Sequence, residues 1–479
     1  MQDTRDFPSD LETPVSAYLK LARSGPGLRP RFLLESVGGD TRDGGTSFLG
    51  FGEAEAVRLE LSHLPDHGSL DERRGPLLHA LRRALARAPR LGGGEEPGAA
   101  TDPTGSRFRG GLVGASSFSL ARALAGLPLA PEDVAGTPTG FLGLAPHHVL
   151  VFDHRRARLT LESSTTGEAR RALEDEVLDA LHRPLAAPGA RTNPCPTARL
   201  QPTTPRSSFL ERVATAQRAI VAGEIYQVVL SMGFEASSDV PAIDLYRALR
   251  RVDPSPYLFL IHLEECAIVG ASPEALLRVD GREASVQPIA GTRPRGTTRS
   301  LDLALERELL ADPKEAAEHV MLVDMARSDL GRVARAGTVS VAPFREVHRF
   351  REVMHLVSGV RSELLGARDA FDAFCATFPA GTVVGAPRTR AMEWIGRLEA
   401  EPRGFYGGAV GLFGHGPDGR PTANQAIAIR TAVLRKGKIS VRAGAGIVRG
   451  SVPEREYEEV LAKTRALARA LSLAEGPRR

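Results

Sequence analysis

Apolar residues in the second half of the chain fall into short runs, rich in β-branched side chains, that predict β-strands. Glycine and polar residues bound these runs, and helical patterns separate only some of them. Several neighbouring runs therefore suit hairpins, and the pattern predicts a mixed α/β chain with largely antiparallel sheets rather than a doubly wound parallel sheet. The predicted strands are residues 226–236, 257–263, 266–272, 408–414, 425–434 and 439–448.

The first half of the chain shows fewer regular patterns and carries no obvious chemistry of its own. Apolar residues at helical spacing predict a helix over 77–88, and alternation predicts strands at 147–154 and 157–163. A stretch rich in Gly, Pro and polar residues, 89–107, indicates an exposed loop.

A proline-rich stretch over 183–207 predicts a linker, because repeated proline excludes both helix and central strand. The linker divides the chain into two regions. We expect these regions to span residues 1–185 and 205–475.

Composition narrows the class of protein. The 479 residues are 42% hydrophobic and 25% charged, as in globular proteins, and no apolar run approaches the roughly 18–20 residues needed to cross a bilayer. The start of the chain lacks the basic and apolar segments of a signal peptide. Cys195, Cys266 and Cys375 lack metal-ligand spacing, so a reduced, cytoplasmic location is expected. The net charge of +4 comes from dispersed arginine rather than a basic patch, which argues against nucleic-acid binding.

Two glutamate pairs, each one helical turn wide, are candidate chemistry. In the first pair, Asp312 suits an N-cap and Pro313 the first helical position, so Glu315 is explained by a capping box. Glu318 has no such explanation, because it shares an apolar helical face with neighbours at i+3, i+4 and i+7. A carboxylate on such a face is costly unless a cation meets it. Those neighbours are Met321, Leu322 and Met325.

The second pair is Glu456 and Glu459. Glu459 and Lys463 have the spacing of a common surface ion pair, and Glu456 is equally compatible with solvated surface. However, carboxylates that arrive in twos, with room for water and substrate oxygens, suit Mg²⁺. Surface ion pairing and a metal site therefore both stay open on spacing alone.

Other features of this half suit anions. Residues 442–451 predict a Gly-x-Gly turn whose backbone N–H groups form a nest for a carboxylate or phosphate. Arg430 falls inside an apolar strand, where a carboxylate partner is expected. Residues 288–296 predict a polar loop containing Thr292. His355 lies on an apolar run, where a histidine is more commonly a satisfied core residue than a catalyst.

Together these motifs resemble the chorismate-utilising enzymes, most closely the large subunits of anthranilate synthases. The match is nearly continuous from about residue 205 to 470, and the first half resembles the same subunits more loosely. The resemblance implies an α+β fold in which two largely antiparallel sheets pack as a sandwich with helices outside. The motifs that carry it include "GEIYQVVLS", "DPSPYLF", "GASPEALL", "PIAGTRPRG", "ADPKEAAEHVMLVDMARSDLGRV", "TFPAGTVVGAPRTRAME", "AIAIRT", "AGAGIV" and "SVPEREYEE".

In that family, two such helices hold Mg²⁺, which bridges to the ring carboxylate of chorismate. The resemblance implies that Glu318 and Glu459 bind the metal and that Glu315 and Glu456 orient them from behind. Lys463 lies near these carboxylates and joins the implied catalytic groups. The implied substrate site consists of Gly291, Thr292, Tyr406, Arg430, Gly444, Ala445 and Gly446.

The implied reaction is that of an anthranilate synthase, in which ammonia attacks C2 as the C4 hydroxyl leaves, and pyruvate is then eliminated. Glu274 and His355 match the acid–base groups, with His355 favoured for the elimination, and Thr382 lies near the amination site. Gln227 stands where isochorismate and salicylate synthases carry a water-activating lysine. Ala290 stands where many aminodeoxychorismate synthases carry a nucleophilic lysine, so attack by ammonia at C2 is what remains.

Departures from the family pattern keep rivals open. Val384, Arg388, Asn424 and Gln425 replace the usual residues and are expected close to the pocket. Such changes are compatible with an enzyme that stops at 2-amino-2-deoxyisochorismate, in secondary metabolism. More distant rivals are an aminodeoxychorismate synthase and a non-catalytic partner that binds chorismate or tryptophan.

The resemblance also implies partners and regulation. A separate glutamine amidotransferase subunit would deliver ammonia, which makes a hetero-oligomer the expected assembly. Residues 1–185 correspond to a regulatory or scaffold region and residues 205–475 to the chorismate-binding catalytic region. A tryptophan feedback pocket is implied at Ser36, Pro256, Tyr257 and Leu258.

Overall fold

The computed structural model describes residues 6–8, 12–36, 45–61, 70–92, 108–129, 139–185, 198–349 and 353–476. Cys195, much of the predicted loop 89–107 and the middle of the predicted linker lie outside these residues. None of the described helices is both long and apolar enough to cross a membrane. The described helices are α1 (Pro14–Leu21), α2 (Leu70–Arg87), α3 (Phe118–Leu124), α5 (Gly167–His182), α6 (Arg206–Val221), α7 (Ala242–Val252), α8 (Arg299–Ala311), α9 (Pro313–Gly331), α10 (Ala370–Thr377), α11 (Arg388–Leu398) and α12 (Pro453–Glu475), with short 3₁₀ turns η1 (Pro26–Leu28) and η2 (Gly381–Val383).

The described strands pair antiparallel throughout. They are β1 (Asp6–Pro8), β2 (Pro30–Glu35), β3 (Thr46–Glu60), β4 (Gly111–Ser116), β5 (Thr139–Asp153), β6 (Arg158–Ser163), β7 (Gln201–Pro202), β8 (Gln227–Ser237), β9 (Tyr257–His262), β10 (Ala267–Ser272), β11 (Ala275–Asp280), β12 (Glu283–Val286), β13 (Ile289–Pro294), β14 (Ser340–Val341), β15 (Glu346–Arg349), β16 (Val353–Val357), β17 (Val360–Glu363), β18 (Gly385–Ala386), β19 (Ala409–His415), β20 (Pro421–Ile427), β21 (Thr431–Arg435) and β22 (Lys438–Ile447).

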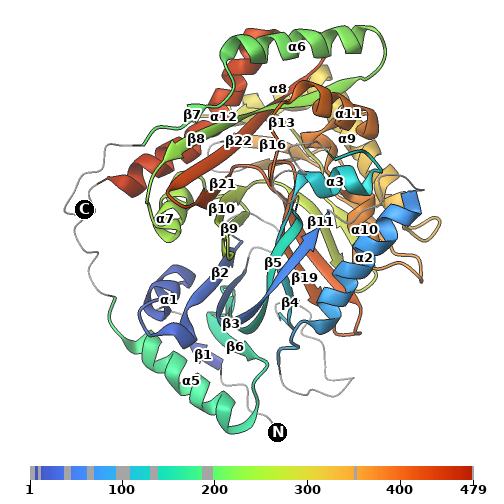
Figure 1. Ribbon diagram of the computed structural model, residues 1–479. Helices are drawn as coiled ribbons and strands as arrows, with labels where there is room; N and C mark the ends of the chain where they lie inside the picture. The colour runs from blue at the N-terminus through green and yellow to red at the C-terminus, as the bar shows by residue number, and fades with distance from the viewer. Residues whose placement is uncertain are drawn as a thin grey trace.

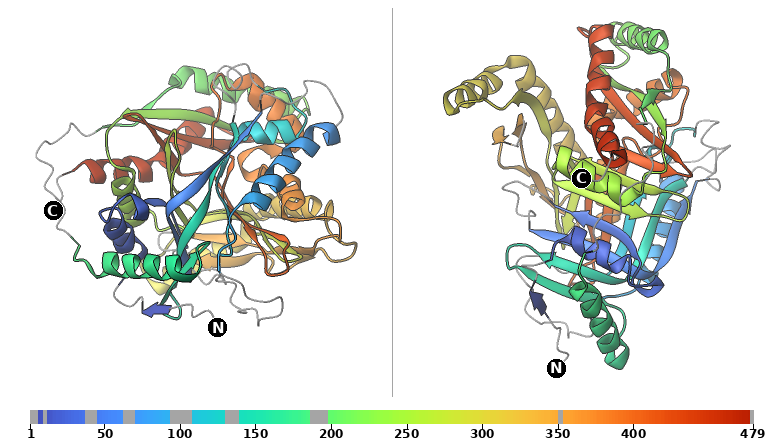
Figure 2. Two further views of the ribbon diagram at one scale, coloured as in Figure 1. Left: turned by 60° about the horizontal axis from the view of Figure 1, so that its bottom comes forward. Right: turned by 90° about the vertical axis from the view of Figure 1, so that its left-hand side faces the viewer.

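Hydrogen bonding links most of these strands into one curled network. Its order is β7–β8–β22–β21–β10–β9–β2–β3–β5–β4–β19–β20–β11–β12–β17–β14, with β18 added beside β8 and with β6 and β1 added beside β5. A separate small sheet has the order β13–β16–β15. In the right-hand view of Figure 2, the yellow α8 and the red α12 form two projections at the same end of the molecule.

Two parts of the network pack face to face around an apolar interior. On β9, Phe259 belongs to this interior, together with residues of β4, β5, β19 and β20, whereas its neighbour Leu258 belongs to the larger core that includes the helices. Phe32 and Leu33 on β2 divide in the same way, as alternating strand residues must. Figure 1 shows the helices at the outside of the strands. The predicted antiparallel sandwich with helices outside is confirmed.

The two halves of the sequence share this sheet. β2 pairs with β9 over Phe32–Glu35 and Leu258–Ile261, and β4 pairs with β19 along its whole length. Each of these ladders joins a strand from the first 185 residues to a strand from beyond residue 205. The functional division into 1–185 and 205–475 stays a prediction.

Most predicted strands are present, and one is interrupted. Residues 425–434, predicted as a single strand, are divided between β20 and β21, with residues 428–430 between them. Arg430 has φ of 49°, in the left-handed region that non-glycine residues rarely adopt, so the chain bends there. This bend places Arg430 outside the strand interior in which it was expected.

Candidate functional site

α9 begins at the predicted N-cap. The Asp312 carboxylate accepts a hydrogen bond from the backbone N–H of Glu315 at 3.3 Å. Only half of the predicted capping box forms, because the Asp312 N–H donates to the carbonyl of Glu308 (3.0 Å). The Glu315 side chain instead faces Arg293, at 3.6 Å, and lies against Gly291, where a Cβ would stand 3.2 Å from the carboxylate. Capping therefore does not account for the Glu315 carboxylate.

Glu318, one turn further along α9, faces α12. Burial raises the pKa of Glu318, and the neighbouring charges of Glu315 and Glu459 raise it further, whereas Lys314 and Lys463 lower it. Since Glu459 and Lys463 belong to α12, the two helices bring their glutamates into electrostatic contact. That the two pairs share a metal ion stays a prediction.

The second pair lies on the first turns of α12. Burial raises the pKa of Glu456, and a hydrogen bond with Ser451 opposes that effect. Lys463 donates to Glu459 at 2.7 Å, so the expected ion pair is formed. The same ammonium also donates to the carbonyl of Gly444 on β22, at 2.9 Å. Lys463 thus ties α12 to the strand that carries the predicted substrate-binding glycines.

The facing glutamates have the chemistry that Mg²⁺ requires. Carboxylates whose pKa values rise through burial and mutual repulsion are stabilised in their charged form by a shared cation. Among the described residues, no group of three or more His, Cys, Asp and Glu side chains converges. Of the four glutamates, Glu318 and Glu456 have pKa values that burial and a neighbouring glutamate raise, and Mg²⁺ commonly completes a pair of carboxylate ligands with water and substrate oxygens.

His355 lies on β16, in the small sheet, opposite Thr292 on β13. The predicted polar loop 288–296 is therefore mostly a strand, bulged at Gly291, where φ is 68°. His355 Nδ1 lies 2.9 Å from the Gly291 carbonyl and 3.0 Å from Thr292 Oγ1. A carbonyl only accepts, so Nδ1 carries the proton and Nε2 the lone pair in the neutral ring. Burial lowers the pKa of His355, and the charge of Arg430 lowers it further, which favours that neutral ring.

Arg430 stands near His355 with an acidic partner of its own. Its Nη1 donates to both carboxylate oxygens of Asp253, at 3.1 and 2.9 Å. The expected carboxylate partner is thus present, but it uses one nitrogen rather than the two-nitrogen fork. Within the described residues, Nε and Nη2 of Arg430 make no hydrogen bond, so they are available to a second anion.

Glu274 and Thr382, both predicted catalytic residues, are hydrogen-bonded to each other. The Thr382 hydroxyl, on η2, donates to Glu274 Oε1 at 3.2 Å. Burial raises the pKa of Glu274 to about 8. The carboxyl is therefore protonated at neutral pH, when it can donate a proton. The backbone of Glu274 is held by β20 through the N–H of Ile427 (3.0 Å).

The predicted Gly-x-Gly nest is wrong, because residues 442–447 continue strand β22. Gly444 and Gly446 pair with Ser231 and Val229 on β8, and neither glycine has the positive φ that a nest alternates. Beyond Val441, β22 is paired on only one side within the described strands. The Gly444 carbonyl in this segment is already engaged by Lys463, so only its remaining unpaired backbone groups are left for a ligand.

The glycines of β22 admit side chains from other elements. A Cβ on Gly444 would stand 2.6 Å from the hydroxyl of Tyr406, and one on Gly446 would stand 2.7 Å from Nε2 of Gln227. Burial raises the pKa of Tyr406 to about 12, so it remains a neutral hydrogen-bonding group. Ala445, between the glycines, packs in the main core, so only its backbone is placed to contact substrate.

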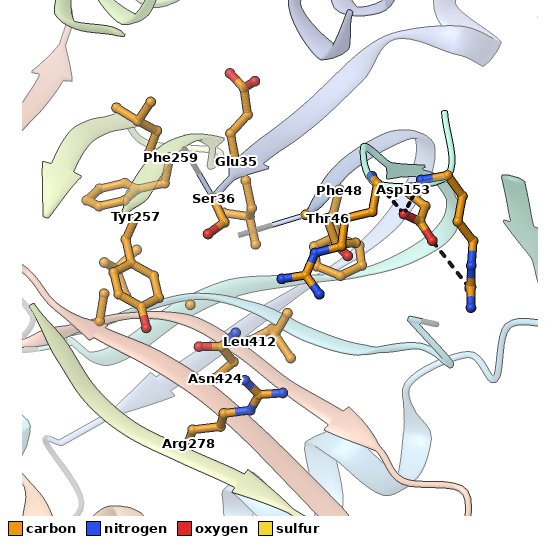
Figure 3. Close-up of a pocket in the computed structure, with 18 residues that line it drawn as sticks. Glu35, Ser36, Thr46, Phe48, Asp153, Tyr257, Phe259, Arg278, Leu412 and Asn424 are labelled. Atoms are coloured by element: carbon orange, nitrogen blue, oxygen red, sulfur yellow. Dashed lines mark hydrogen bonds and ion pairs between the residues drawn. The ribbon is translucent and has the colours of Figure 1, made fainter. Parts of the chain in front are cut away.

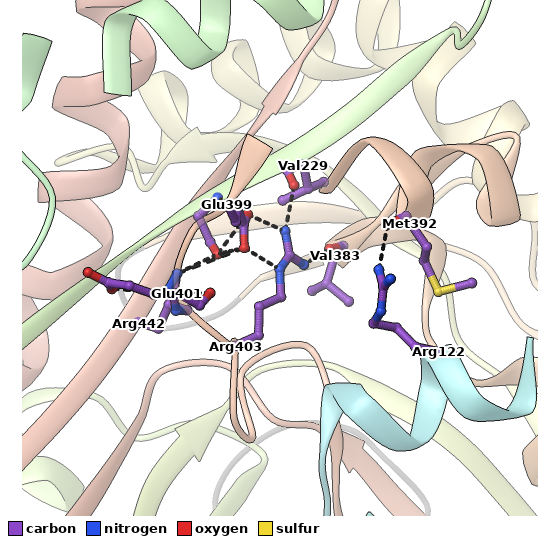
Figure 4. Close-up of polar contacts among 9 residues, drawn as sticks. Arg122, Val229, Val383, Met392, Glu399, Glu401, Arg403 and Arg442 are labelled. Carbon is purple, nitrogen blue, oxygen red and sulfur yellow. Dashed lines mark hydrogen bonds and ion pairs between the residues drawn. The ribbon is translucent and has the colours of Figure 1, made fainter. Parts of the chain in front are cut away.

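A buried ion network that sequence reasoning missed supports this site (Figure 4). Arg403 donates two hydrogen bonds to the Glu399 carboxylate, from Nε (2.8 Å) and Nη2 (2.6 Å). It also donates to the backbone carbonyls of Val383 (2.8 Å) and Val229 (2.7 Å). These bonds tie η2, which carries Thr382, to β8. Burial alone would raise the pKa of Glu399, but Arg403 and then neighbouring cations outweigh it and lower the pKa.

The sequence context of Arg442 could have predicted this network. Arg442 lies 3.8 Å from Glu399 and stands between apolar residues of a strand, the pattern that drew attention to Arg430. A guanidinium in an apolar strand needs a carboxylate partner. This holds more strongly for Arg442 than for Arg430, because the Arg442 side chain is only 8% exposed.

Three of the four predicted inhibitor residues line a separate cavity (Figure 3). Ser36, Tyr257 and Leu258 lie in its wall, and Pro256 precedes Tyr257 without lining it. We call this space the β2–β9 cavity. Its other walls include Leu34, Phe48, Phe259, Arg278, Leu412 and Asn424. It is apolar in the main, with polar groups at its margins, as small-molecule sites generally are.

The residues that depart from the family pattern are not gathered at the catalytic groups. Asn424 lines the β2–β9 cavity, and Gln425 is buried beside it on β20. Arg388 forms an ion pair with Asp329 of α9 and donates to a backbone carbonyl at 3.3 Å, so it joins two helices. Val384 is fully buried, and its carbonyl accepts from β8 at 2.8 Å. The influence of these positions on the substrate pocket stays a prediction.

Comparisons with known proteins identify the family of this chain. The family model for chorismate binding enzymes matches residues 30–469. Anthranilate synthase component 1 of Thermus thermophilus is 43% identical over 476 residues, covering 98% of both chains. The Streptomyces coelicolor protein of the same name is 41% identical, covering 98% of this chain and 89% of its own.

Solved structures place the fold in the same group. Anthranilate synthase component I from Streptococcus pneumoniae superposes with a TM-score of 0.75 at 30% identity, covering 98% of this chain and all of its own. The menaquinone-specific isochorismate synthase from Escherichia coli superposes at 0.65 with 22% identity, covering 98% and 94%, which shows a shared fold. The chain therefore belongs to the chorismate-binding enzymes, and within that family it groups with component 1 of the anthranilate synthases.

Proposed function

We propose that this chain aminates chorismate at C2 with ammonia, in a Mg²⁺-dependent reaction, and then eliminates pyruvate to release anthranilate. The observation that carries the proposal is that Lys463 of α12 binds both Glu459 (2.7 Å) and the Gly444 carbonyl of β22 (2.9 Å), while the charges of Lys463 and Glu459 act on Glu318 of α9. Chorismate is a dicarboxylate, and the site offers Arg430, Lys463 and a cation at the glutamates to balance its charge.

The two steps need an acid and then a base. In the first, ammonia forms a bond to C2 as the ring double bond shifts and the C4 hydroxyl leaves; Glu274, with its raised pKa, supplies the proton that makes water of that leaving group. In the second, His355 Nε2 takes the C2 proton as the C–O bond to the enolpyruvyl group breaks, and the ring becomes aromatic. The released group gains a proton and becomes pyruvate.

Mg²⁺ bound at Glu318 and Glu459 would supply Lewis-acid charge to the ring carboxylate. Glu315 and Glu456, one turn away on the same helices, would orient these ligands. Lys463 would keep Glu459 in place through its 2.7 Å ion pair. Gly291, Thr292, Tyr406 and the β22 edge would complete the substrate site.

The remaining assignments follow from the same relatives. We infer that ammonia comes from a separate glutamine amidotransferase component, so the working enzyme is a hetero-oligomer. We infer that the β2–β9 cavity takes tryptophan as a feedback inhibitor and that the enzyme acts in tryptophan biosynthesis in the cytoplasm. The first 185 residues would supply part of this cavity, through Ser36, and the region from 205 to 475 the catalytic groups.

The test uses the purified chain with chorismate, Mg²⁺ and excess ammonium at alkaline pH. Anthranilate fluorescence and pyruvate in equal amounts are expected. Loss of chorismate to an aminated, non-fluorescent product would show an enzyme that stops at 2-amino-2-deoxyisochorismate. Binding of chorismate without consumption would leave a non-catalytic role and overturn the proposal.

A further inference from the structure

A helix from the first half of the chain lies against segment 403–408, which carries a tyrosine of the proposed substrate site. α3 begins at Phe118, whose backbone N–H donates to the carbonyl of Gly404 at 2.8 Å. On the preceding strand, the Ser116 carbonyl lies so close to Gly408 that a Cβ on this glycine would stand 2.0 Å from it. The end of β4 and the start of α3 therefore contact this segment through backbone atoms.

The Phe118 ring also meets the guanidinium at the centre of the buried ion network. The guanidinium carbon of Arg403 lies 4.5 Å from the centroid of the Phe118 ring and 5.5 Å from that of the Tyr406 ring. A guanidinium within about 6 Å of an aromatic face is attracted by the ring, most strongly where water is excluded. Phe118 and Arg403 are both buried, so this attraction acts in the interior of the protein.

The position of Arg403 affects two residues of the site. The N–H of Tyr406 donates to the Arg403 carbonyl at 3.0 Å, and the Tyr406 hydroxyl lies 2.6 Å from where a Cβ on Gly444 would stand. Arg403 also donates to the carbonyl of Val383 at 2.8 Å, directly after Thr382. A shift of the guanidinium would therefore displace the tyrosine at the edge of β22 and the threonine on η2.

α3 holds the acidic partner of Arg403 as well. Arg122 Nη1 donates to the carbonyl of Met392 on α11 at 2.9 Å (Figure 4). The same nitrogen would lie 2.7 Å from a Cβ on Gly396, one turn further along α11. α11 ends one residue before Glu399, which binds Arg403. α3 thus contacts the elements that supply both members of the central ion pair.

We propose that Phe118 is a positioning residue for the substrate site, because its ring holds Arg403 and thereby keeps the Tyr406 hydroxyl at the edge of β22. The inference rests on the proposed function, because it takes Tyr406 as a contact of chorismate. It gives the first half of the chain, predicted to be a regulatory or scaffold region, a direct part in shaping the substrate site.

The experiment measures chorismate affinity of the full chain by calorimetry, with Mg²⁺ present and ammonia absent so that no turnover occurs. Phe118→Leu keeps an apolar side chain but removes the ring face, so chorismate binding is expected to weaken about tenfold. Phe118→Tyr keeps the ring and should bind within about twofold of the wild type. In steady-state assays with ammonium, Phe118→Leu should raise the KM for chorismate more than it lowers kcat.

A double-mutant cycle shows whether Phe118 acts through Tyr406. Tyr406→Phe alone removes the hydroxyl and is expected to weaken chorismate binding about tenfold. Adding Phe118→Leu to that variant should then change the affinity by no more than about twofold, whereas independent effects would multiply to about a hundredfold. Phe51→Leu is the matched control, because Phe51 is a fully buried phenylalanine on β3 that packs against His148. This control should leave chorismate binding unchanged.

Urea unfolding first establishes that each variant folds. If Phe118→Leu does not fold, Phe118→Met replaces it, because methionine also lacks a ring and adapts its shape to fill gaps. Weakened binding confined to the variants without a ring, together with a non-additive double variant, supports the inference.

Three results would overturn the inference while leaving anthranilate formation intact. These are wild-type affinity in the variants without a ring, a Phe118→Tyr variant as weak as Phe118→Leu, and losses that multiply in the double variant. A wild type that binds chorismate and shows the expected pattern, but makes no anthranilate, overturns the proposed function instead. A wild type that does not bind chorismate overturns both.

Discussion

Replacing Glu274 by glutamine is expected to change how the stability of this protein depends on pH. Burial raises the pKa of Glu274 from 4.5 to about 8 in the folded chain. The folded state therefore holds one more proton than the unfolded state between these values. The stability that the protonated carboxyl contributes is fully present below pH 4.5 and is lost as the pH rises toward 8.

The magnitude follows from linkage. One extra proton in the folded state lowers the free energy of unfolding by about 1.4 kcal/mol for each pH unit inside this window. Between pH 5.5 and 7.5, the wild type should lose about 2.7 kcal/mol from this group alone. Glutamine does not titrate, so the Glu274→Gln protein should not lose this free energy of unfolding. Its stability should therefore rise relative to that of the wild type as the pH rises.

The assay is urea unfolding at pH 5.5, 6.5 and 7.5. Glu55→Gln serves as the control, because Glu55 is a carboxylate on β3 that is 58% exposed. If the stability difference between Glu274→Gln and the wild type does not vary with pH, Glu274 is already ionised at neutral pH and cannot be the acid of the first step. In the activity assay, the same variant should lose about 10²–10⁴ in amination rate.

Three other substitutions test separate parts of the site. Glu318→Gln is expected to weaken Mg²⁺ binding by at least about 10-fold; calorimetry that gives the wild-type affinity would remove Glu318 from the metal site. His355→Gln is expected to accumulate the aminated intermediate, because proton removal from C2 slows by about 10²–10⁴, and chromatography that shows normal anthranilate would contradict the assigned role. Arg403→Met leaves Glu399 buried without its main cation, so a loss of about 3–5 kcal/mol is expected in urea unfolding. A loss below about 1 kcal/mol would mean that solvent reaches Glu399.

Local signals in the sequence were reliable where neighbours in the chain decide the structure. Asp312 and Pro313 predicted the start of α9, and short apolar runs located β8, β9, β10 and β22. The prediction failed where a partner distant in the chain decides. Gly444 lies in a strand rather than a turn because the chain there pairs with β8, opposite Ser231. Arg430 lies outside a strand because the backbone bends toward Asp253, and no local sequence pattern predicts that bend.

Residue roles at the site were predicted through resemblance rather than through pattern. Spacing alone left Glu459 and Lys463 as an ordinary surface ion pair, and the 2.7 Å contact between them is indeed formed. A metal site differs from a surface ion pair by the approach of α9 to α12. Sequence periodicity cannot predict that approach. The support provided by Arg403 was missed because its partners on β8 and η2 are separated from it in sequence.

The sharing of one sheet by both halves of the chain has a consequence for synthesis on the ribosome. β4 pairs with β19, and β2 pairs with β9. The early strands therefore cannot pair until strands hundreds of residues later in the chain have been synthesised. Such long-range pairings fold slowly, and until they form the emerging chain exposes apolar strand edges that invite aggregation. A fragment of residues 1–185 expressed alone would keep those edges open. The nascent chain is therefore a natural client for chaperones until β19 has left the ribosome.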